Sequence, residues 1–305
     1  MTYDILIVGG GPAGLTAAIY GARAGKTVAL IERESIGGQI VYSPHVENYP
    51  GLPGISGSEL ANRLYEQVEA LGVEVISEEV QQAERADGGG FTLKTDYGSH
   101  TGRTLILATG VQHRRLGLPG EEELVGSGVS YCAVCDGAFY AGRDVAVVGG
   151  GDTALQDALF LSGVCRSVTV AVRRDRFRGE AALAAQLRAK GNVTVLFEHK
   201  PAAYVTDGDG ALTGLTLDGP EGQRTLPVEG VFLAVGQEPC SAAFAPLAGV
   251  DEAGYFPVDE RCRTAVPGLY VAGDCRAKAV RQLTTAVSDG AVAALAACAD
   301  LDAGK

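Results

Sequence analysis

The feature that most constrains the fold of this chain is an internal repeat. The stretch Asp4–Glu34 aligns without gaps with Asp144–Arg174, at an offset of 140 residues and with nine identical residues in 31. Each copy contains a short strand rich in β-branched residues, a triple glycine, a segment of helical periodicity and a second apolar strand. This order predicts two β-α-β units, each with parallel strands.

A second pair of segments extends the repeat. Phe91–Gly110 ends in LILATG, Leu212–Gly236 ends in VFLAVG, and both contain hairpin-like turns. The stretch Asp251–Ala297 has no glycine-rich opening, so we expect it to complete the first module. We therefore predict an α/β fold with two Rossmann-like dinucleotide-binding domains, the second inserted into the first. The expected ranges are 1–114, 115–242 and 243–305, joined by segments near 111–118 and 237–245.

Composition and charge exclude several other classes. A chain of 305 residues has room for two domains, and 46% hydrophobic residues argue against disorder. The net charge is −12, and the sequence shows no basic patch of the kind that a nucleic-acid binder needs. The negative charge also disfavours binding to anionic membranes. The apolar stretch Ile5–Ala22 is too rich in glycine for a spanning helix, and no signal peptide is visible. We expect a cytoplasmic protein, in which seven cysteines are not a disulfide framework.

The first glycine loop is a complete G-x-G-x-x-G motif. Gly9, Gly11 and Gly14 allow a tight turn and a close approach of the backbone to a pyrophosphate, which the following helix N-terminus attracts. Glu32 ends the second strand, 18 residues after Gly14, where a carboxylate accepts hydrogen bonds from a ribose hydroxyl. The alternative is an ordinary tight turn between a strand and a helix. We favour a dinucleotide site.

The second loop predicts a different nucleotide. It contains Gly149 and Gly151 and ends in Ala154, the G-x-G-x-x-A variant. The position that matches Glu32 is Val172, so no acid is present to repel a 2′-phosphate. The basic residues that follow it are Arg173, Arg174 and Arg178. Guanidinium groups suit phosphate oxygens, which favours NADPH here over a solvated basic turn partnered by Asp175 and Glu180.

Two dinucleotide sites in one chain indicate electron transfer. We expect NADPH to give hydride to a second, tightly held cofactor, with FAD as the candidate. The spacing alone does not separate FAD from NAD at the first site.

The pair Cys132 and Cys135 forms the only C-x-x-C motif. A structural zinc site usually needs a second pair of ligands, which the remaining cysteines and the scattered histidines do not supply, so we expect no metal. A pair of inert buried thiols would not explain the spacing, and a redox dithiol explains it best. Asp136 follows directly and could donate a proton to a leaving thiolate if burial raises its pKa. A helix cap or turn is the alternative role for Asp136.

Taken together, these motifs resemble the low-molecular-weight thioredoxin reductases of the bacterial type. The resemblance covers essentially the whole chain. The matching motifs, in order, are GGGPAG with Glu32, Gly37-Gly38-Gln39, Val46–Gly51, Ala108-Thr109-Gly110, SYCAVCDG, GGGDTA, VRRDRFR, Gly273-Asp274 and Arg281-Gln282.

The resemblance implies a homodimer with FAD in the first module, NADPH in the inserted module and thioredoxin, or a thioredoxin-like protein, as partner. The implied FAD residues are Gly9, Gly11, Pro12, Ala13, Gly14, Glu32, Gly38, Gln39, Asn48, Ala108, Thr109, Gly110, Gly273, Asp274, Arg281 and Gln282. The implied NADPH residues are Gly149, Gly151, Asp152, Thr153, Ala154, Arg173, Arg174 and Arg178. Cys135 is implied as the flavin-proximal sulfur, Cys132 as the sulfur that attacks thioredoxin and Asp136 as the acid.

The chain departs from the family pattern at Val172, where relatives usually carry histidine. Because both following arginines remain, we expect the affinity for NADPH to be altered rather than lost. Cys275 follows Asp274 directly, and we expect this thiol to be inert. The alternatives to an NADPH-dependent thioredoxin reductase are a ferredoxin-dependent flavin thioredoxin reductase, a flavoprotein reductase of another dithiol partner and a non-catalytic redox sensor.

Overall fold

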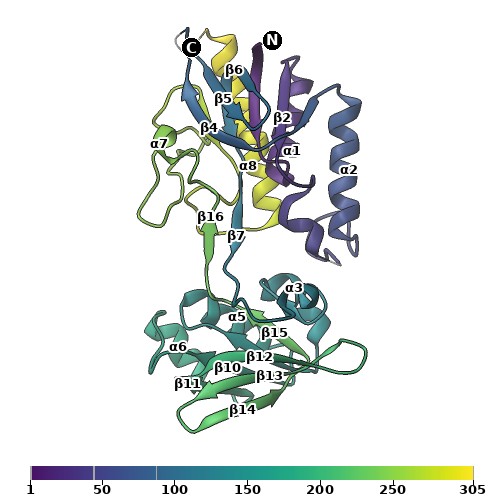
Figure 1. Cartoon of the computed structure of the whole chain (residues 1–305), viewed down its shortest axis with the longest axis vertical. Coiled ribbons are helices and arrows are strands. Elements are labelled where there is room, and N and C mark those ends of the chain that lie inside the picture. Colours follow the sequence, from purple (N-terminus) through teal and green to yellow (C-terminus); the bar gives the residue numbers. More distant parts are fainter. Residues whose placement is uncertain (1, 44, 87, 305) are drawn as a thin grey trace. The chain divides into compact units, whose positions relative to one another are not determined.

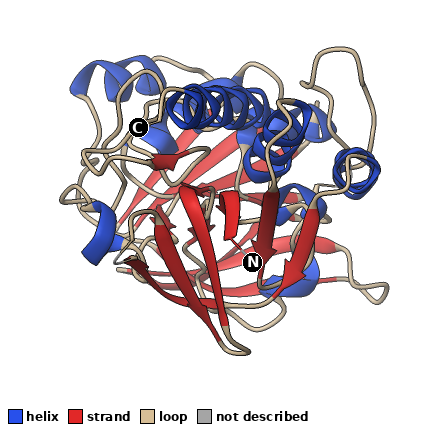
Figure 2. Ribbon diagram, turned by 90° about the horizontal axis from the view of Figure 1, so that it is seen from above, coloured by secondary structure: helices blue, strands red, loops and turns tan. Residues whose placement is uncertain are grey.

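The structure is a computed structural model that describes residues 2–43, 45–86 and 88–304. The chain divides into two compact units. Unit 1 comprises residues 1–112 and 238–305, and unit 2 comprises residues 113–237. Both units contain helices and strands, which Figure 2 shows in blue and red. Unit 2 is therefore inserted into the chain of unit 1, which confirms the predicted architecture of two α/β modules.

Unit 1 is built on a sheet with the strand order β3-β2-β1-β6-β5-β4, in which β17 also pairs with β6. The strands β1, β2, β3, β6 and β17 are parallel to one another where they pair, whereas β4-β5 and β5-β6 are antiparallel pairs. The elements are β1 (Thr2–Val8), α1 (Pro12–Arg23), β2 (Val28–Glu32), the 3-10 helix η1 (Gly38–Tyr42), α2 (Gly57–Ala70), β3 (Glu74–Ser77), β4 (Val80–Arg85), β5 (Phe91–Thr95), β6 (Ser99–Leu107), α7 (Ala245–Ala248), β17 (Leu269–Val271) and α8 (Leu283–Asp302).

The core of unit 1 follows from the predicted β-α-β unit. The last four residues of β1 are all buried, as expected for a parallel strand that is covered on both faces. Helix α1 begins with Pro12, whose missing N–H costs nothing in the first turn. On one face of the sheet, α1 and α8 pack together over Ile5, Ile7 and Ile106, and they run side by side in Figure 1. The C-terminal segment therefore completes the first module, as predicted.

Unit 2 contains a parallel sheet of order β11-β10-β9-β15-β8 and an antiparallel sheet of order β12-β13-β14. The elements are α3 (Glu121–Leu124), β8 (Val129–Ser130), α4 (Ala133–Asp136), the 3-10 helix η2 (Gly137–Tyr140), β9 (Asp144–Val148), α5 (Asp152–Ser162), β10 (Ser167–Val172), α6 (Ala181–Arg188), β11 (Val193–Phe197), β12 (Lys200–Thr206), β13 (Leu212–Gly219), β14 (Gly222–Pro227) and β15 (Gly230–Leu233).

The two glycine turns of the repeat are held by the same steric constraint. Gly9 has a φ of 108°, and a Cβ placed there would lie 2.3 Å from the carbonyl oxygen of Ala108. Gly149 has a φ of 152°, and its Cβ would lie 2.4 Å from the carbonyl oxygen of Ala234. Both positions therefore require glycine. Ala108 and Ala234 belong to LILATG and VFLAVG, so the second pair of repeated segments also occupies equivalent places.

The two units are connected by β7 (Val111–His113) and β16 (Gln237–Pro239), which pair as a two-stranded sheet. Gly110 and Gly236 flank these strands with φ values of 65° and 110°. Across the described ranges, no helix is both long enough and apolar enough to cross a membrane.

Candidate functional site

The predicted C-x-x-C motif forms a disulfide in unit 2. The sulfur atoms of Cys132 and Cys135 are 2.08 Å apart, and their Cα atoms are separated by 5.3 Å. Cys132 precedes the one-turn helix α4, and its sulfur accepts a hydrogen bond from the backbone N–H of Cys135 at 3.2 Å. Both cysteines are half-buried, while Val134 between them is exposed. The disulfide is therefore within reach of the protein surface.

Asp136 lies directly behind the disulfide at the end of α4. Its Oδ2 atom accepts a hydrogen bond of 2.7 Å from the Ser130 hydroxyl, and its Oδ1 atom is buried without a hydrogen-bond partner among the described residues. Burial raises the pKa of Asp136, and the Ser130 hydrogen bond lowers it by a smaller amount. The raised pKa favours the protonated form of this carboxyl group, the form that a proton donor needs.

Tyr131, the residue before Cys132, packs against the first connecting segment. Its ring stacks on His113 with centroids 4.6 Å apart, and its hydroxyl donates to Glu121 at 3.1 Å. The buried Glu121 carboxylate also accepts hydrogen bonds from the backbone N–H groups of residues 116–118. Burial lowers the pKa of His113 to about 4, so its ring is neutral at physiological pH.

Helix α5 packs against the residues that follow the disulfide. A Cβ on Gly137 would lie 2.9 Å from the side chains of both Phe160 and Leu161. The glycine that follows Asp136 thus packs η2 closely against these two side chains of α5. Phe160 is 40% exposed, so an apolar side chain of α5 reaches the surface beside this segment.

The other five cysteines are free thiols, and four of them are buried. Burial raises the pKa of every one, to about 11 for Cys165 and Cys262. A thiol that remains protonated at neutral pH is a poor nucleophile. Cys275 is completely buried, and its inertness stays a prediction.

The first glycine loop forms an open cradle in unit 1. A Cβ on Gly11 would meet no atom closer than 4.0 Å, and no side chain caps the N-terminus of α1. Gly14 is required for packing, because its Cβ would overlap the carbonyl oxygen of Gly9 at 1.8 Å. Glu32 ends β2, and its Oε2 atom accepts a hydrogen bond of 2.6 Å from the N–H of Gly10. The backbone N–H groups of the first turn, in Ala13 and Gly14, are thus available to a phosphate group.

The remaining residues of the first predicted site converge on this cradle. The loop containing Gly38 and Gln39 borders it, since a Cβ on Gly38 would lie 3.3 Å from the Cα of Gly11. Asn48 donates a hydrogen bond of 3.2 Å to the side chain of Gln282. Ala108, Thr109 and Gly110 follow β6, next to the glycine turn.

Gly273 and Asp274 reach the cradle from the C-terminal part of unit 1. A Cβ on Gly273 would lie 2.9 Å from the Cβ of Ala13, so this loop touches the first turn of α1. The Oδ1 atom of Asp274 is buried and forms an ion pair with Lys278 at 3.0 Å, without the geometry of a directed hydrogen bond. This oxygen can accept a hydrogen bond from a ligand hydroxyl. The open cradle and the buried acceptor both fit FAD.

Arg281 is held in place beside Asp274. Its Nε atom donates to the Asp274 carbonyl oxygen at 3.1 Å, and its guanidinium group lies 4.1 Å from the centroid of the Tyr255 ring. Gln282 is the N-cap of α8 and forms a capping box with Thr285. The structure therefore brings all the residues of the first predicted site together within unit 1.

The second glycine loop forms a similar cradle in unit 2. A Cβ on Gly151 would meet nothing within 4 Å, and no side chain caps α5. Thr153 and Ala154 lie in the first turn of α5. Asp152 also begins this helix, but its Oδ1 atom accepts a hydrogen bond of 2.6 Å from the N–H of Glu180. Asp152 thus fastens the arginine-rich segment to the glycine loop.

The arginines of the second site lie where the repeat predicts them. Arg173 and Arg174 follow β10 directly, and the N–H of Arg178 donates to the carbonyl oxygen of Gly150 at 2.7 Å. All three side chains are exposed, and among the described residues none of the three forms an ion pair. The alternative interpretation, a basic turn neutralised by Asp175 and Glu180, therefore has no support in the structure. The free guanidinium groups beside an open glycine cradle fit NADPH.

Sequence patterns did not reveal three residues that support the site. Ser130 stands two positions before Cys132, and only its contact with Asp136 shows its role. Lys278 lies four residues after Asp274, a spacing that is a weak signal without the ion pair. Asp289 belongs to α8 and contacts the Gly273 loop from a distant part of the sequence.

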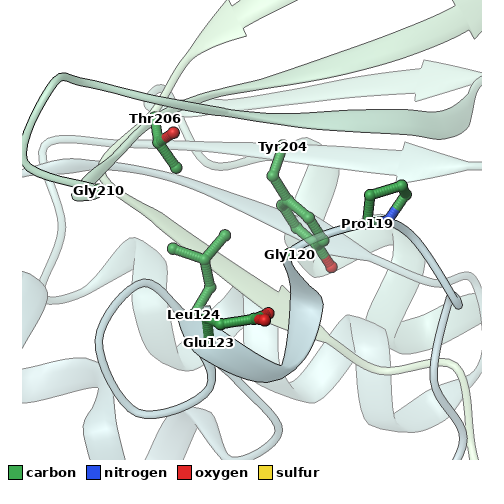
Figure 3. Close-up of a pocket in the computed structure, with 7 residues that line it drawn as sticks. All are labelled: Pro119, Gly120, Glu123, Leu124, Tyr204, Thr206 and Gly210. Carbon is green, nitrogen blue, oxygen red and sulfur yellow. The ribbon is translucent and has the colours of Figure 1, made fainter.

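A pocket of about 260 Å³ opens elsewhere in unit 2 (Figure 3). It is lined by Pro119, Gly120, Glu123, Leu124, Tyr204, Thr206 and Gly210. The hydroxyl group of Tyr204 is buried there without a hydrogen-bond partner among the described residues, and burial raises its pKa. None of the predicted site residues lines this pocket, so it is separate from the candidate site.

Comparison with known proteins identifies the class of this chain. The family model described as pyridine nucleotide-disulphide oxidoreductase matches residues 3–290. A thioredoxin reductase of Listeria monocytogenes is 41% identical over 295 residues, covering 95% of this chain and 91% of the relative. A thioredoxin reductase of Bacillus subtilis is 39% identical over 296 residues, covering 96% and 92%.

Solved structures give the same result. The thioredoxin reductase of Streptococcus pyogenes is similar with a TM-score of 0.94 and 39% identity, and 99% of each chain is covered. That of Giardia duodenalis is similar with a TM-score of 0.92 and 33% identity, also over 99% of each chain. The chain therefore belongs to the pyridine nucleotide-disulphide oxidoreductase family and, within it, to the low-molecular-weight thioredoxin reductases of the bacterial type.

Proposed function

We propose that this protein is an NADPH-dependent thioredoxin reductase. The observation that carries the proposal is the Cys132–Cys135 disulfide with the buried Asp136 behind it, in the same unit as an open glycine cradle with unpaired arginines. A disulfide that can be reduced, an acid of raised pKa and a nucleotide site are the parts that such a reaction needs. The unpaired Arg173 and Arg174 support NADPH rather than ferredoxin as the electron donor.

Unit 1 would hold FAD. Gly11 and the first turn of α1 would contact its pyrophosphate, Glu32 the ribose of its adenosine half, and Asp274 the hydroxyl groups near the phosphate. Bound FAD would supply a ring that takes up two electrons from NADPH and passes them to a disulfide. Unit 2 would bind NADPH at Gly149, Gly151 and the three arginines, so the predicted ranges 1–114 and 243–305 correspond to the FAD domain and 115–242 to the NADPH domain.

The reduced cysteines would then reduce thioredoxin by thiol–disulfide exchange. The Cys132 thiolate attacks one sulfur of the thioredoxin disulfide, which forms a mixed disulfide and releases one thioredoxin thiolate. The Cys135 thiolate attacks the Cys132 sulfur, re-forms the Cys132–Cys135 disulfide and releases the second thioredoxin thiolate. Asp136 donates a proton to a leaving thiolate and is reprotonated from solvent. The two electrons lost by the Cys132–Cys135 dithiol are the two gained by thioredoxin.

We also propose that the protein acts as a homodimer in the cytoplasm. The family resemblance supports the dimer, and Tyr20 of α1 and Leu295 of α8 are exposed large apolar side chains on two helices that pack together. Five free, mostly buried thiols in one chain suit a reducing compartment.

Steady-state turnover tests the proposed function. NADPH oxidation is followed with bacterial thioredoxin and an excess of a disulfide that reoxidises thioredoxin. The proposal predicts continuous oxidation that stops in a Cys132→Ser variant and is much slower with NADH. Oxidation of only one equivalent of NADPH would contradict the proposal and indicate a sensor. Turnover with reduced ferredoxin but not with NADPH would show that the alternative donor is correct.

A further inference from the structure

The loop Gly273–Lys278 meets the first turn of α1, where a helix N-terminus attracts anions. Gly273 contacts Ala13 of that turn, and a Cβ on Gly290 of α8 would lie 2.1 Å from the carbonyl oxygen of Ala13. The loop and the N-terminal half of α8 are thus packed against the residues that would bind a pyrophosphate. Charges on the loop therefore lie close to the residues that would bind a pyrophosphate.

Three charged residues of this loop and one of α8 form a cluster, which we call the charge cluster: Asp274, Arg276 and Lys278 of the loop, and Asp289 of α8. The Lys278 ammonium lies 3.0 Å from Asp274 Oδ1 and 3.0 Å from Asp289 Oδ2. Arg276 pairs with Asp289 Oδ1 at 2.8 Å. The Lys278 side chain is only 9% exposed, so water screens these interactions weakly. The formal charges of the cluster sum to zero.

An acid in a phosphate site needs an explanation, because a carboxylate repels the pyrophosphate of FAD. Asp274 offers a buried oxygen that makes no directed hydrogen bond, which suits a ligand hydroxyl. Its negative charge is unfavourable at the same place, where the anion-binding turn of α1 begins. The contact between Lys278 and Asp274 offsets that charge and leaves the oxygen free to accept a hydrogen bond.

The Arg276–Asp289 pair also holds the loop on α8. Asp289 also accepts a hydrogen bond of 3.2 Å from the N–H of Gly273, so the loop has two attachments to α8 that do not involve Lys278. Lys278 itself also reaches α8, through Asp289 and through a hydrogen bond of 3.4 Å to the Thr285 hydroxyl. Its contact with the Asp274 carboxylate is the one that lies within the loop.

We propose that Lys278 is a positioning residue for FAD, which neutralises Asp274 so that this carboxylate can bind a ligand hydroxyl beside the pyrophosphate. The inference rests on the proposed FAD site of unit 1. It predicts that the importance of Lys278 depends on the charge of Asp274, which a purely structural role would not require.

The test is the rate at which FAD leaves the full-length holoprotein, followed by the rise in flavin fluorescence after dilution. Lys278→Met in the wild-type background should accelerate release by about tenfold or more, because it leaves an uncompensated negative charge at the site. The same substitution in an Asp274→Asn background should accelerate release by less than about threefold, because the charge to be compensated is gone. Lys278→Arg, which keeps the charge, should stay close to the wild type.

Lys26→Met is the matched control. Lys26, which follows α1, pairs with Asp302 at the C-terminal end of α8, so its loss removes a lysine–aspartate ion pair of unit 1 at the ends of α1 and α8 remote from the cradle. FAD release from this variant should match the wild type. Equal acceleration by Lys278→Met in both backgrounds would overturn the inference.

Two further outcomes are distinguishable. If Lys278→Met does not fold, Lys278→Gln gives the same comparison with a polar side chain, and the same criteria decide. If the wild-type protein binds no FAD, the proposed function itself fails, whereas FAD binding with equal effects in both backgrounds refutes only the role of Lys278.

Discussion

Asp157 of α5 provides a quantitative test of the electrostatics of unit 2. Its side chain is half-buried, and among the described residues it has no hydrogen-bond or ion-pair partner. Burial raises its pKa from 3.8 to about 7. The helix therefore carries a carboxyl group that the folded state prefers to keep protonated.

The sign of the stability effect follows from this raised pKa. Between about pH 4 and pH 7 the folded state holds a proton that the unfolded state has released, so the stability contributed by that proton falls as pH rises. A tenfold change in proton affinity corresponds to about 1.4 kcal/mol, so the rise in the pKa sets a ceiling of about 4 kcal/mol above pH 7. Because the side chain is partly exposed to water, we halve this figure to about 2 kcal/mol. At pH 5 the same argument leaves a cost of less than about 1 kcal/mol.

Asp157→Asn should therefore stabilise the protein more at high pH than at low pH. We expect the free energy of unfolding to rise by about 2 kcal/mol at pH 8 and by less than about 1 kcal/mol at pH 5, because the amide does not ionise. The measurement is urea denaturation of the full-length holoprotein at both pH values, followed by circular dichroism.

Asp218→Asn is the control for this experiment. It makes the same change at an exposed aspartate of unit 2, on β13, and tests for a general effect of losing one negative charge. An Asp157→Asn protein that is no more stable than the wild type at pH 8, or that gains equally at both pH values, would refute the reasoning.

The remaining predictions concern the redox site. Cys135→Ser should abolish thioredoxin reduction and leave reduction of the flavin by NADPH intact in stopped-flow absorbance; equal loss of both would refute its flavin-proximal role. Asp136→Asn should slow thioredoxin reduction about 10²-fold, and it should remove the decline in rate that the wild type shows as rising pH deprotonates this acid. A variant with the wild-type pH profile would exclude Asp136 as the proton donor. Arg173→Ala combined with Arg174→Ala should raise the KM for NADPH about tenfold or more and leave that for NADH within about threefold; an unchanged preference would remove these residues from the 2′-phosphate site.

Much of the fold was predictable because the repeat has strict steric requirements. Gly9 and Gly149 each lie against the end of a parallel strand with no space for a Cβ, so both turns preserve the same residue type. Glu32 and Val172 occupy the same position in the two copies, and the difference between them could be interpreted without coordinates. Local spacing also identified the Cys132–Cys135 pair, because a four-residue turn brings the two thiols together.

The features that escaped prediction depend on contacts between distant segments. The weak amphipathic pattern of α5 does not show that Asp157 is half-buried without a partner. Asp289 meets Gly273 only because α8 returns to the first module after the insertion. Glu121 resembles any acid in the first turn of a helix, and only the folded segment shows that it accepts three backbone N–H groups.

The central claim is that electrons pass from NADPH through the flavin to the Cys132–Cys135 pair and on to thioredoxin. The most direct measurement is an anaerobic titration in which NADPH bleaches the yellow absorbance of the holoprotein and oxidised thioredoxin is then added. The account predicts that thioredoxin restores the absorbance of the wild type but not that of a Cys132→Ser variant. Restoration in both proteins, or in neither, would contradict it.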